Sequence, residues 1–558
     1  MRRYGWLFLL TGCAITPAAT VTPATPSGNA TPSTTPSTSP GMPVKPSAGD
    51  PFAVHGALRE ETLAAPPTLD LVAGPFPAAP KGLGASPATC APFVARKKGG
   101  AQISCTDLQS ARASLDTALG AADPQKRDAA LVDLEACAQL PPGFVRALRA
   151  ELAPIACADA IVAPLLASPP KDLSGVVHHA LTGIALSARL ARTGTTPPKL
   201  GPPFEKSRVL AFIKGPMSAW IGEQAAEIQE LSLTGSRLGY YGKAVVAVEA
   251  GLADLRLVEI VRAVPVPDGI GKDPELKGVY EAALDQMLEP RKIRGRDAAL
   301  VGLQELASIG ALRDDRVVRA RKLLSVLYAG RRIDALDGLL LPKAETLPAS
   351  SVEERLAARL PTFYAGLVLD PQASTANGTL RALSERGIPR AMRLALRAQD
   401  LPEDARATYA RARIGLGQQY WRAVDFDEAA ALISHGTAKT RTEEASFYLA
   451  LALALRGGPD DAAAMIKKPP PETLGIGDTS ALDHIARAKP PGPHAGIAAF
   501  DAALIRRIAA PRAPDPAVWR DVAVRFREAA ALLSDPETHA RAQDGAREAE
   551  AIASEITK

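Results

Sequence analysis

The sequence contains few of the residues that nucleic-acid and sugar sites need. Aromatic residues make up only 4% of the 558 residues, which leaves few beyond those needed for core packing to stack on bases or sugar rings. Lys and Arg number 65 against 60 for Asp and Glu, so the net charge of +5 is small for this length. Such a balance does not indicate a nucleic-acid partner or an anionic membrane surface.

Recognisable catalytic and metal-binding motifs are also lacking. The seven histidines include no H-E-x-x-H pattern and no pair three or four residues apart. GYYGK at residues 239–243 is too short for a phosphate loop and has no Ser or Thr after its lysine. SPPK at residues 168–171 matches S-x-x-K only formally, because two prolines oppose the helical turn that this chemistry needs. We therefore expect no enzyme activity, no cofactor and no metal site.

The first residues form a short export signal. Two arginines precede a seven-residue apolar run at residues 4–10, whereas about 20 apolar residues are needed to cross a bilayer. LTGC at residues 10–13 resembles the lipobox of bacterial lipoproteins. The resemblance implies that the chain is cut before Cys13, that diacylglycerol is joined to its sulfur and that the new amino group is acylated. A simple secretory signal with a chance cysteine is the alternative.

A long Pro-, Thr- and Ser-rich tract follows this cysteine. Residues 14–50 contain one charged residue, Lys45, before Asp50. Such a tract cannot bury enough apolar surface to offset its ordering entropy, so we expect it to be disordered and partly polyproline II. At about 3 Å per residue it would reach on the order of 100 Å. A lipid anchor followed by a long tether is a sensible arrangement, which favours lipidation of Cys13. With Ala14 as the residue after the cysteine, the chain resembles the lipoproteins that are sent to the outer membrane.

These features predict the organisation of the N-terminal part and its location. We expect a signal peptide over residues 1–12, then a lipidated Cys13 with its tether over residues 13–52, and then an irregular segment over residues 53–107. The protein would be anchored by lipid in the cell envelope. The sorting pattern of that family implies the outer membrane, on a side that the sequence does not define.

Four further cysteines, at positions 90, 105, 137 and 157, lie close together in the sequence. An even, clustered set in an exported protein indicates two disulfides, for which three pairings exist. We favour Cys90–Cys105, which would close a Gly- and Lys-containing loop, and Cys137–Cys157, which would staple a helical hairpin. A four-thiolate zinc site is the alternative, but these spacings lack the close C-x2-C pairs that such sites usually carry.

The rest of the chain has the pattern of an all-α protein. From Ser110 onward, apolar residues recur three and four positions apart, and proline pairs separate the helical stretches. Asp-Pro pairs at residues 515–516 and 535–536 indicate two helix starts, with Asp as the cap and Pro in the first turn. We expect one divergent helical array over residues 108–345 and a second over residues 346–558, ending in a capping helix.

The second array resembles tetratricopeptide repeats. Leu416, Gly417 and Tyr420 are similar to the first-helix signature of that family, in which small residues let two helices pack closely. The resemblance covers residues 380–470 and implies an α-solenoid of helical hairpins, with the earlier units as divergent tetratricopeptide-like or HEAT-like pairs. Three segments align on a turn followed by alanine: Gly387–Ala391, Asp425–Ala429 and Gly458–Ala462.

Two groups of residues are candidates for binding a partner. Basic residues gather between residues 289 and 334, either as a solvated helix face or as a basic rim for an acidic partner, because the planar fork of arginine suits carboxylates and phosphates. The candidate arginines are Arg291, Arg294, Arg296, Arg316, Arg319, Arg331 and Arg332. The candidates from the predicted groove are Gln418, Gln419, Arg422 and Tyr448.

The absence of catalytic motifs and the repeat pattern predict a membrane-anchored, non-catalytic scaffold or adaptor. It would bind an envelope protein or peptide partner in the groove of its helical array. An envelope hydrolase or glycan-processing enzyme, with a site assembled from distant helices, is one alternative, and a structural envelope protein without a discrete partner is another. An enzyme should gather buried carboxylates or histidines in one concave pocket, whereas a scaffold should have a broad groove.

Overall fold

The computed structural model of the protein is all-α, as the sequence predicts. The residues that it describes are 50–61, 87–94, 104–312, 314–328, 332–343, 351–369, 401, 403–434, 441–467, 474–510 and 515–557, and these ranges contain no β-strand. The predicted signal peptide, Cys13 and the predicted tether up to residue 49 lie outside them. Of the helices in these ranges, none combines the length and the apolar character that spanning a bilayer requires.

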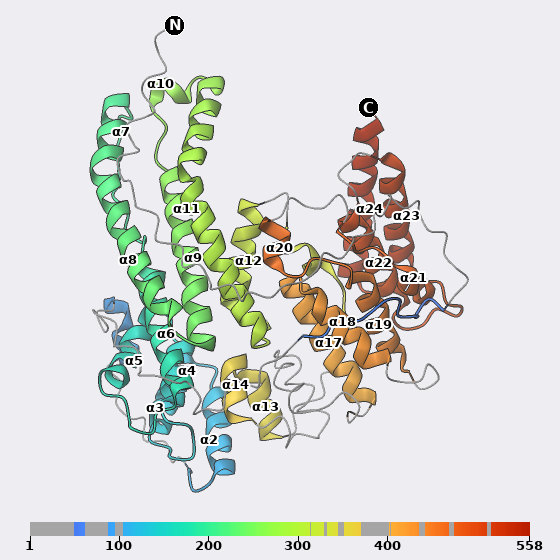
Figure 1. The fold of residues 1–558 in the computed structure, drawn as a ribbon, viewed down its shortest axis with the longest axis horizontal. Helices are drawn as coiled ribbons and strands as arrows, with labels where there is room; N and C mark the ends of the chain where they lie inside the picture. Colours follow the sequence, from blue (N-terminus) through green and yellow to red (C-terminus); the bar gives the residue numbers. More distant parts are fainter. Residues whose placement is uncertain are drawn as a thin grey trace, which may run out of the picture.

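The first helical group precedes residue 328 and is built around one long central helix. After the short α1 (Ala91–Val94), its helices are α2 (Leu108–Gly120), α3 (Pro124–Leu134), α4 (Phe144–Leu152), α5 (Ala158–Ala167), α6 (Gly175–Arg192), α7 (Lys206–Phe212), α8 (Ser218–Ser236), α9 (Tyr240–Arg262), α10 (Asp268–Gly271), α11 (Pro274–Ser308) and α12 (Asp315–Leu327). The central helix α9 packs against α6, α8 and α11 (Figure 1).

Glycines let α9 approach its neighbours so closely that backbones touch. A Cβ atom on Gly242 of α9 would lie 2.1 Å from the carbonyl oxygen of His179 in α6. A Cβ atom on Gly302 of α11 would lie 2.6 Å from the backbone nitrogen of Val248 in α9. Only glycine permits such an approach, because it has no side-chain carbon. These glycines therefore determine where α6 and α11 cross α9.

The second group follows residue 332 and lies on the other side of the molecule in Figure 1. Its elements are the 3-10 helix η5 (Ala335–Gly338), α13 (Val352–Arg359), α14 (Thr362–Val368), α17 (Glu403–Tyr420), α18 (Ala423–Ser434), α19 (Glu443–Leu455), α20 (Ala462–Lys467), α21 (Ser480–Ala486), α22 (Ala495–Ala509), α23 (Pro516–Leu532) and α24 (Pro536–Thr557). From α17 to α24, each helix packs on the next, except that α19 packs on α21 and α20 packs on α11.

Local sequence signals in this group are confirmed. The Asp515 carboxylate accepts a hydrogen bond from the backbone N–H of Ala517 at 2.8 Å, and α23 begins at Pro516. Asp535 caps α24 in the same way. Gly417 of α17 faces the ring of Phe426 in α18, and an added Cβ atom would lie 2.7 Å from that ring. Gly417 therefore lets α17 and α18 pack closely, as the pattern predicts for this small residue. The aligned segment Gly387–Ala391 lies outside the described residues.

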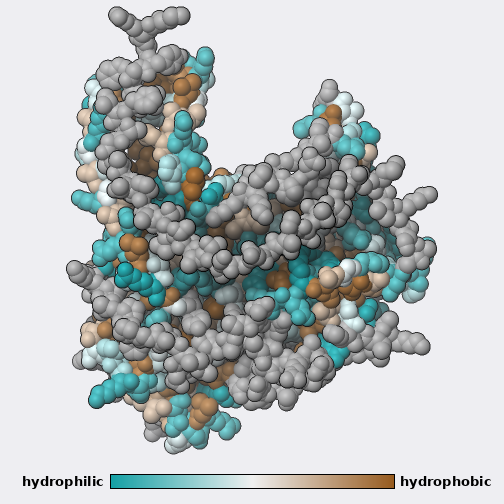
Figure 2. Space-filling model, viewed as in Figure 1, coloured by the Kyte–Doolittle hydropathy of each residue, from teal (hydrophilic) through white to brown (hydrophobic). Residues whose placement is uncertain are grey.

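The two groups share one hydrophobic core. A continuous cluster of buried apolar side chains runs from Ala111 in α2 to Ile505 in α22. In addition, α13 returns to the first group, where Arg355 and Arg359 both bind the Asp116 carboxylate of α2 at 2.7 Å. Figure 2 shows a hollow between two projecting ends, formed by α7–α11 and by α23–α24, and apolar and polar residues are interspersed on this face.

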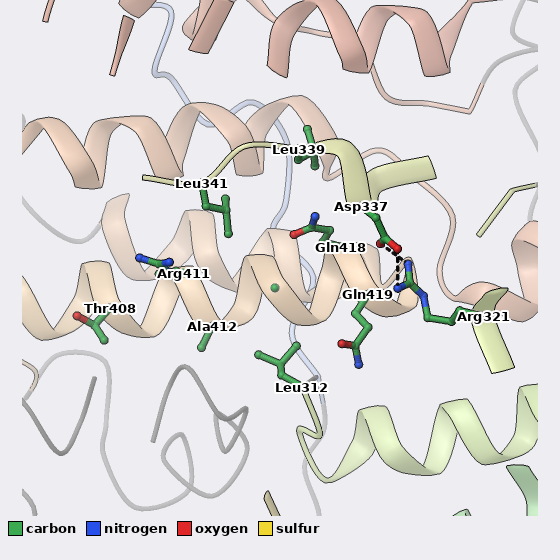
Figure 3. A pocket seen from close by; sticks show the side chains of 11 residues that line it. Leu312, Arg321, Asp337, Leu339, Leu341, Thr408, Arg411, Ala412, Gln418 and Gln419 are labelled. Atoms are coloured by element: carbon green, nitrogen blue, oxygen red, sulfur yellow. Dashed lines mark hydrogen bonds and ion pairs between the residues drawn. The ribbon is translucent and has the colours of Figure 1, made fainter. Parts of the chain in front are cut away.

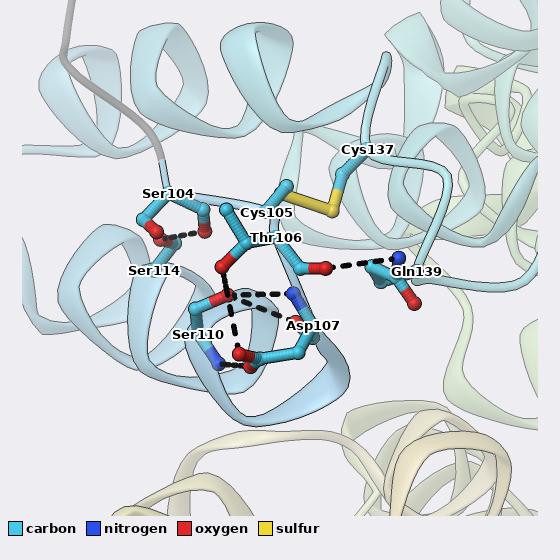
Figure 4. The surroundings of a disulfide bond; sticks show 8 residues. All are labelled: Ser104, Cys105, Thr106, Asp107, Ser110, Ser114, Cys137 and Gln139. Atoms are coloured by element: carbon cyan, nitrogen blue, oxygen red, sulfur yellow. Dashed lines mark hydrogen bonds between the residues drawn. A yellow bond between two sulfur atoms is a disulfide. The ribbon is translucent and has the colours of Figure 1, made fainter.

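Two disulfides join the cysteines in a pairing that differs from the one favoured by the sequence. The bonds are Cys90–Cys157 and Cys105–Cys137. Cys90 ends a 3-10 turn that lies near the start of α5, where Cys157 is placed, whereas Cys105 precedes α2 opposite the α3–α4 connection that holds Cys137. Figure 4 shows the second bond beside the Asp107 cap of α2. Helix packing, rather than sequence proximity, decides which cysteines meet.

Candidate functional site

The candidate arginines between residues 289 and 334 bind carboxylates of the same chain. Arg291 and Arg294 both donate to Asp254 of α9, at 2.9 and 2.6 Å. Arg319 donates to Glu249, also of α9, at 3.2 Å. The remaining contacts of this set are Arg296 with Asp297, Arg316 with Glu151, and Arg332 with Asp334, while Arg331 lies outside the described residues. The arginines that contact Asp254, Glu249 and Glu151 compensate buried charges, whereas Asp297 and Asp334 are partly exposed. A role of this set in partner binding stays a prediction.

Arg316 belongs to a buried polar cluster that joins α4, α9, α12 and α14. The Tyr241 hydroxyl donates to Glu151 at 2.7 Å, and the Arg316 guanidinium donates to both of these side chains. The Tyr364 hydroxyl donates to the carbonyl of Ala147 at 3.2 Å. Burial raises the pKa of Tyr241 and of Tyr364 well above the ordinary value, so both stay protonated donors. The cluster is a polar joint between the two helical groups.

All four candidates from the predicted groove have partners within the fold. Gln418 and Gln419 of α17 line a cavity of about 360 Å³ beside η5 (Figure 3). Their amides donate to the carbonyls of Leu336 and Ala311, at 2.6 and 2.9 Å. The Tyr448 side chain is buried within α19 and does not face a groove. The fourth candidate, Arg422, contacts a different part of the chain.

Residues 50–61, here called the docked segment, lie against the second helical group. This stretch is elongated and has no helix or strand, and Figure 1 shows it in blue beside α18 and α19. Arg422 binds the Glu61 carboxylate of the docked segment at 2.8 Å. The sequence placed this stretch partly in the tether and partly in the irregular segment, and it predicted no contact with the array.

The array holds the main chain of the docked segment. Arg456, at the end of α19, donates to the carbonyls of His55 and Ala57 at 2.6 and 2.9 Å. The Asp427 carboxylate accepts from the backbone N–H of Arg59 at 3.2 Å. Glu428 accepts from the backbone N–H of Glu61 at 3.2 Å. Contacts at every second residue are those expected for an elongated chain whose alternate residues face its binding surface.

The side chain of Arg59 makes the densest set of contacts. Its Nε atom donates to Asp427 at 3.0 Å, its Nη1 atom to Asp460 at 2.5 Å, and its Nη2 atom to the carbonyl of Arg456 at 2.8 Å. Asp427 and Asp460 occupy the third position of the aligned segments Asp425–Ala429 and Gly458–Ala462. Two aligned segments of the second helical group therefore supply carboxylates to one guanidinium.

Local structure explains how the acidic side chains of α18 are held. The helix begins at Ala423, directly after a turn in which Trp421 has a φ of 59°. Its first turns carry Asp425 and Glu428, both buried, and Arg413 of α17 contacts them at 2.6 and 3.0 Å. Acids near a helix N-terminus are also favoured by the helix dipole. Arg413 thus bridges the two acids, and Arg422 supplies a second positive charge to Asp425 at 2.9 Å.

The other end of the docked segment carries an aromatic contact. The Phe52 ring meets the His484 ring of α21 edge-on, with ring centroids 5.6 Å apart, and the Arg441 guanidinium lies 5.9 Å from the centre of the Phe52 ring. A groove of about 1300 Å³ runs beside residues 50–59, and its walls include Arg456 and His484. The docked segment therefore does not fill the groove in which it lies.

Sequence reasoning identified Arg422 but missed Asp427, Asp460 and Arg456. The signal for the two aspartates was present, because both occupy the same position in aligned repeat segments. No pattern in residues 50–61 shows that they bind residues more than 360 positions further along, and the longest of these hydrogen bonds joins residues 401 positions apart. Among the described residues no group of three or more His, Cys, Asp and Glu side chains is placed to hold a metal ion.

Comparison of the chain with protein-family models, with curated proteins and with solved structures finds no match.

Proposed function

We propose that this protein is a lipid-anchored, non-catalytic scaffold of the cell envelope, and that its second helical array binds an elongated segment of a partner protein. The lipobox-like sequence at residues 10–13 and the tether that follows support the anchor. The stacking of consecutive helices from α17 to α24 supports an α-solenoid with tetratricopeptide-like units. Solenoids of this kind use side chains from successive repeats to bind extended or helical segments.

The docked segment is the observation that carries this proposal. The array contacts its main chain through Arg456, Asp427 and Glu428, and main-chain recognition does not depend on one particular ligand sequence. The carboxylates of the site are bound by arginines, as Asp427 is by Arg456 at 2.8 Å. Such pairs fix charge for recognition, whereas a hydrolase needs a carboxyl group free to exchange a proton.

Substitution of the predicted lipidated cysteine tests the anchor. In cells that produce the full chain, we expect the native protein in the membrane fraction and the Cys13→Ser variant in the soluble or unprocessed fraction, because a thioether to diacylglycerol requires the sulfur. Ala14→Ser, next to it, should leave the protein in the membrane. Fractionation with labelled fatty acid measures both properties. A Cys13→Ser variant that stays membrane-bound and labelled would contradict the anchor.

Binding of an added peptide tests the array. A fluorescent peptide of residues 50–61 should bind saturably to the full chain carrying Arg59→Ala and Glu61→Ala, measured by anisotropy. Asp460→Arg in that chain should weaken binding by about tenfold or more, since it removes a hydrogen bond between charged groups and adds repulsion. The Asp460 side chain is 74% exposed, so its reversal does not disturb the core.

The matched control for that variant is Asp544→Arg on α24, a charge reversal at a side chain that is 59% exposed. It should leave the affinity of the peptide unchanged. Absence of saturable binding to any of these chains, or equal loss in both reversals, would refute the array as a peptide-binding site.

A further inference from the structure

We propose that the docked segment is an internal ligand, and that the partner which replaces it is a protein segment of the same chemistry. That chemistry is an aromatic residue, an arginine seven positions later and an acidic residue two positions after the arginine, as in Phe52, Arg59 and Glu61. The inference rests on the proposed function, because it names the partner and the regulation of the same site.

The arginine is the residue of the ligand that the site recognises most specifically. The three donor positions of Arg59 reach Asp427, Asp460 and the carbonyl of Arg456 at the same time. A planar guanidinium fits this arrangement, whereas the single ammonium of lysine cannot reach three separated acceptors with fixed geometry. The aspartates of the two aligned segments therefore select for arginine in the partner.

The acidic residue is read two positions further along. Residues two apart in an elongated chain face the same side, so Arg59 and Glu61 both face the array while Glu60 is exposed. Arg422 binds Glu61 at 2.8 Å. A partner with an acid at this position gains that pair, and one with a basic residue would be repelled.

The site contains ion pairs that do not involve the docked segment. Asp427 is bound to Arg456 at 2.8 Å, and Arg422 is bound to Asp425 at 2.9 Å. The buried charges of the array are therefore compensated with or without a ligand, so release does not expose an unpaired buried ion. An occupant that can leave without collapse of its site is exchangeable.

The docked segment is also weakly held. The side chains of Arg59 and Asp460 are 44% and 74% exposed, so water screens this ion pair and weakens it. Its apolar anchors are Phe52 and Leu58, both only partly buried. The groove beside residues 50–59 gives a competing segment access to the same wall.

Because the docked segment and the array belong to one chain, their effective concentration is on the order of 1 mM. A partner must compete with this occupant, so its apparent affinity falls in proportion to the fraction of chains in which the site is open. The docked segment also overlaps the end of the predicted tether at residue 52, so occupancy of the site is coupled to the anchor end of the chain.

The experiment compares full chains that differ only in the docked segment. The labelled peptide of residues 50–61 should bind the Arg59→Ala, Glu61→Ala chain about tenfold more tightly than the native chain. Glu60→Ala, whose side chain is exposed, should behave as the native chain. Peptides with Ala or Lys in place of the arginine should lose most of the affinity for the open chain, and a peptide with Ala in place of the second acid should lose part of it.

Each outcome decides a separate point. Equal affinity for the native and the substituted chain would overturn the internal ligand and leave the peptide-binding site intact. Equal binding of the arginine and lysine peptides would overturn the stated partner chemistry. Sedimentation that finds a native dimer, converted to a monomer by Arg59→Ala and Glu61→Ala, would place the segment on a second copy and overturn the internal ligand. Absence of binding to every chain would refute the proposed function itself.

Discussion

Replacing Gly302 of α11 by alanine is expected to lower the free energy of unfolding by about 1–3 kcal/mol, whereas Gly278→Ala in the same helix should raise it by up to about 1 kcal/mol. Both substitutions gain the same helix propensity, because alanine is the better helix former by about that amount. The difference between them therefore reports the packing of α11 alone.

The surroundings of the two glycines explain the opposite signs. A Cβ atom on Gly302 would lie 2.4 Å from the Val248 side chain and 2.6 Å from the Val248 backbone nitrogen, so α9 and α11 would have to separate. A Cβ atom on Gly278 would meet no heavy atom within 4 Å. Movement of backbone in a packed core is costly, since neighbouring side chains cannot take up the displacement.

Denaturant unfolding of the full chain with its disulfides intact measures this difference. The midpoint should fall for Gly302→Ala and should stay equal or rise for Gly278→Ala, with the slope of the transition unchanged. If the two variants were equally stable, the close contact between α9 and α11 would be contradicted.

The second large effect is expected at the buried cluster around Arg316. Glu151→Gln should lower the free energy of unfolding by about 3–5 kcal/mol, because it leaves a buried guanidinium without its main counter-ion. Asp314, 3.7 Å from Arg316, compensates only part of this charge. The double variant Glu151→Leu, Arg316→Met should be clearly more stable than Glu151→Gln, since it removes both charges together.

Thermal and denaturant unfolding of the native chain, Glu151→Gln and the double variant measure this effect, and the single variants Glu151→Leu and Arg316→Met complete a double-mutant cycle. Arg332→Ala is the matched control, because Arg332 is 62% exposed and its pair with Asp334 should be worth at most about 1 kcal/mol. A Glu151→Gln variant no less stable than Arg332→Ala would show that the cluster does not carry the joint between α4, α9, α12 and α14.

Features that depend on neighbouring residues were predicted well. Asp515 and Pro516 specify a helix start by themselves, because the cap and the first turn lie within three residues. The recurrence of apolar residues three and four positions apart likewise predicted helices rather than strands. Pairing of the cysteines was not predictable in this way, because Cys90 meets Cys157 only through the packing of helices that the local pattern does not orient.

The basic residues show that a local charge pattern likewise does not reveal ion-pair partners that lie far away in the sequence. Arg291 and Arg294 stand in a sequence stretch that reads as a positive surface, but Asp254, about 40 positions earlier, lies directly opposite them in α9. The candidate site likewise contains residues that the sequence suggested and residues that it did not. The repeat alignment brought attention to Arg422, whereas its partner Glu61 belongs to a segment more than 360 positions away, and only the folded chain brings them together.

The glycine contacts of α9 also bear on how the molecule moves. Gly242 touches α6 and Gly302 of α11 touches α9, so a small axial slide of any of these helices would drive side chains into a neighbouring backbone. Shear between packed helices, a common route for domain motion, is therefore blocked in this layer. The three helices therefore behave as one rigid unit. Rearrangement between the two helical groups has to occur where side chains alone meet, as between Arg355 of α13 and Asp116 of α2.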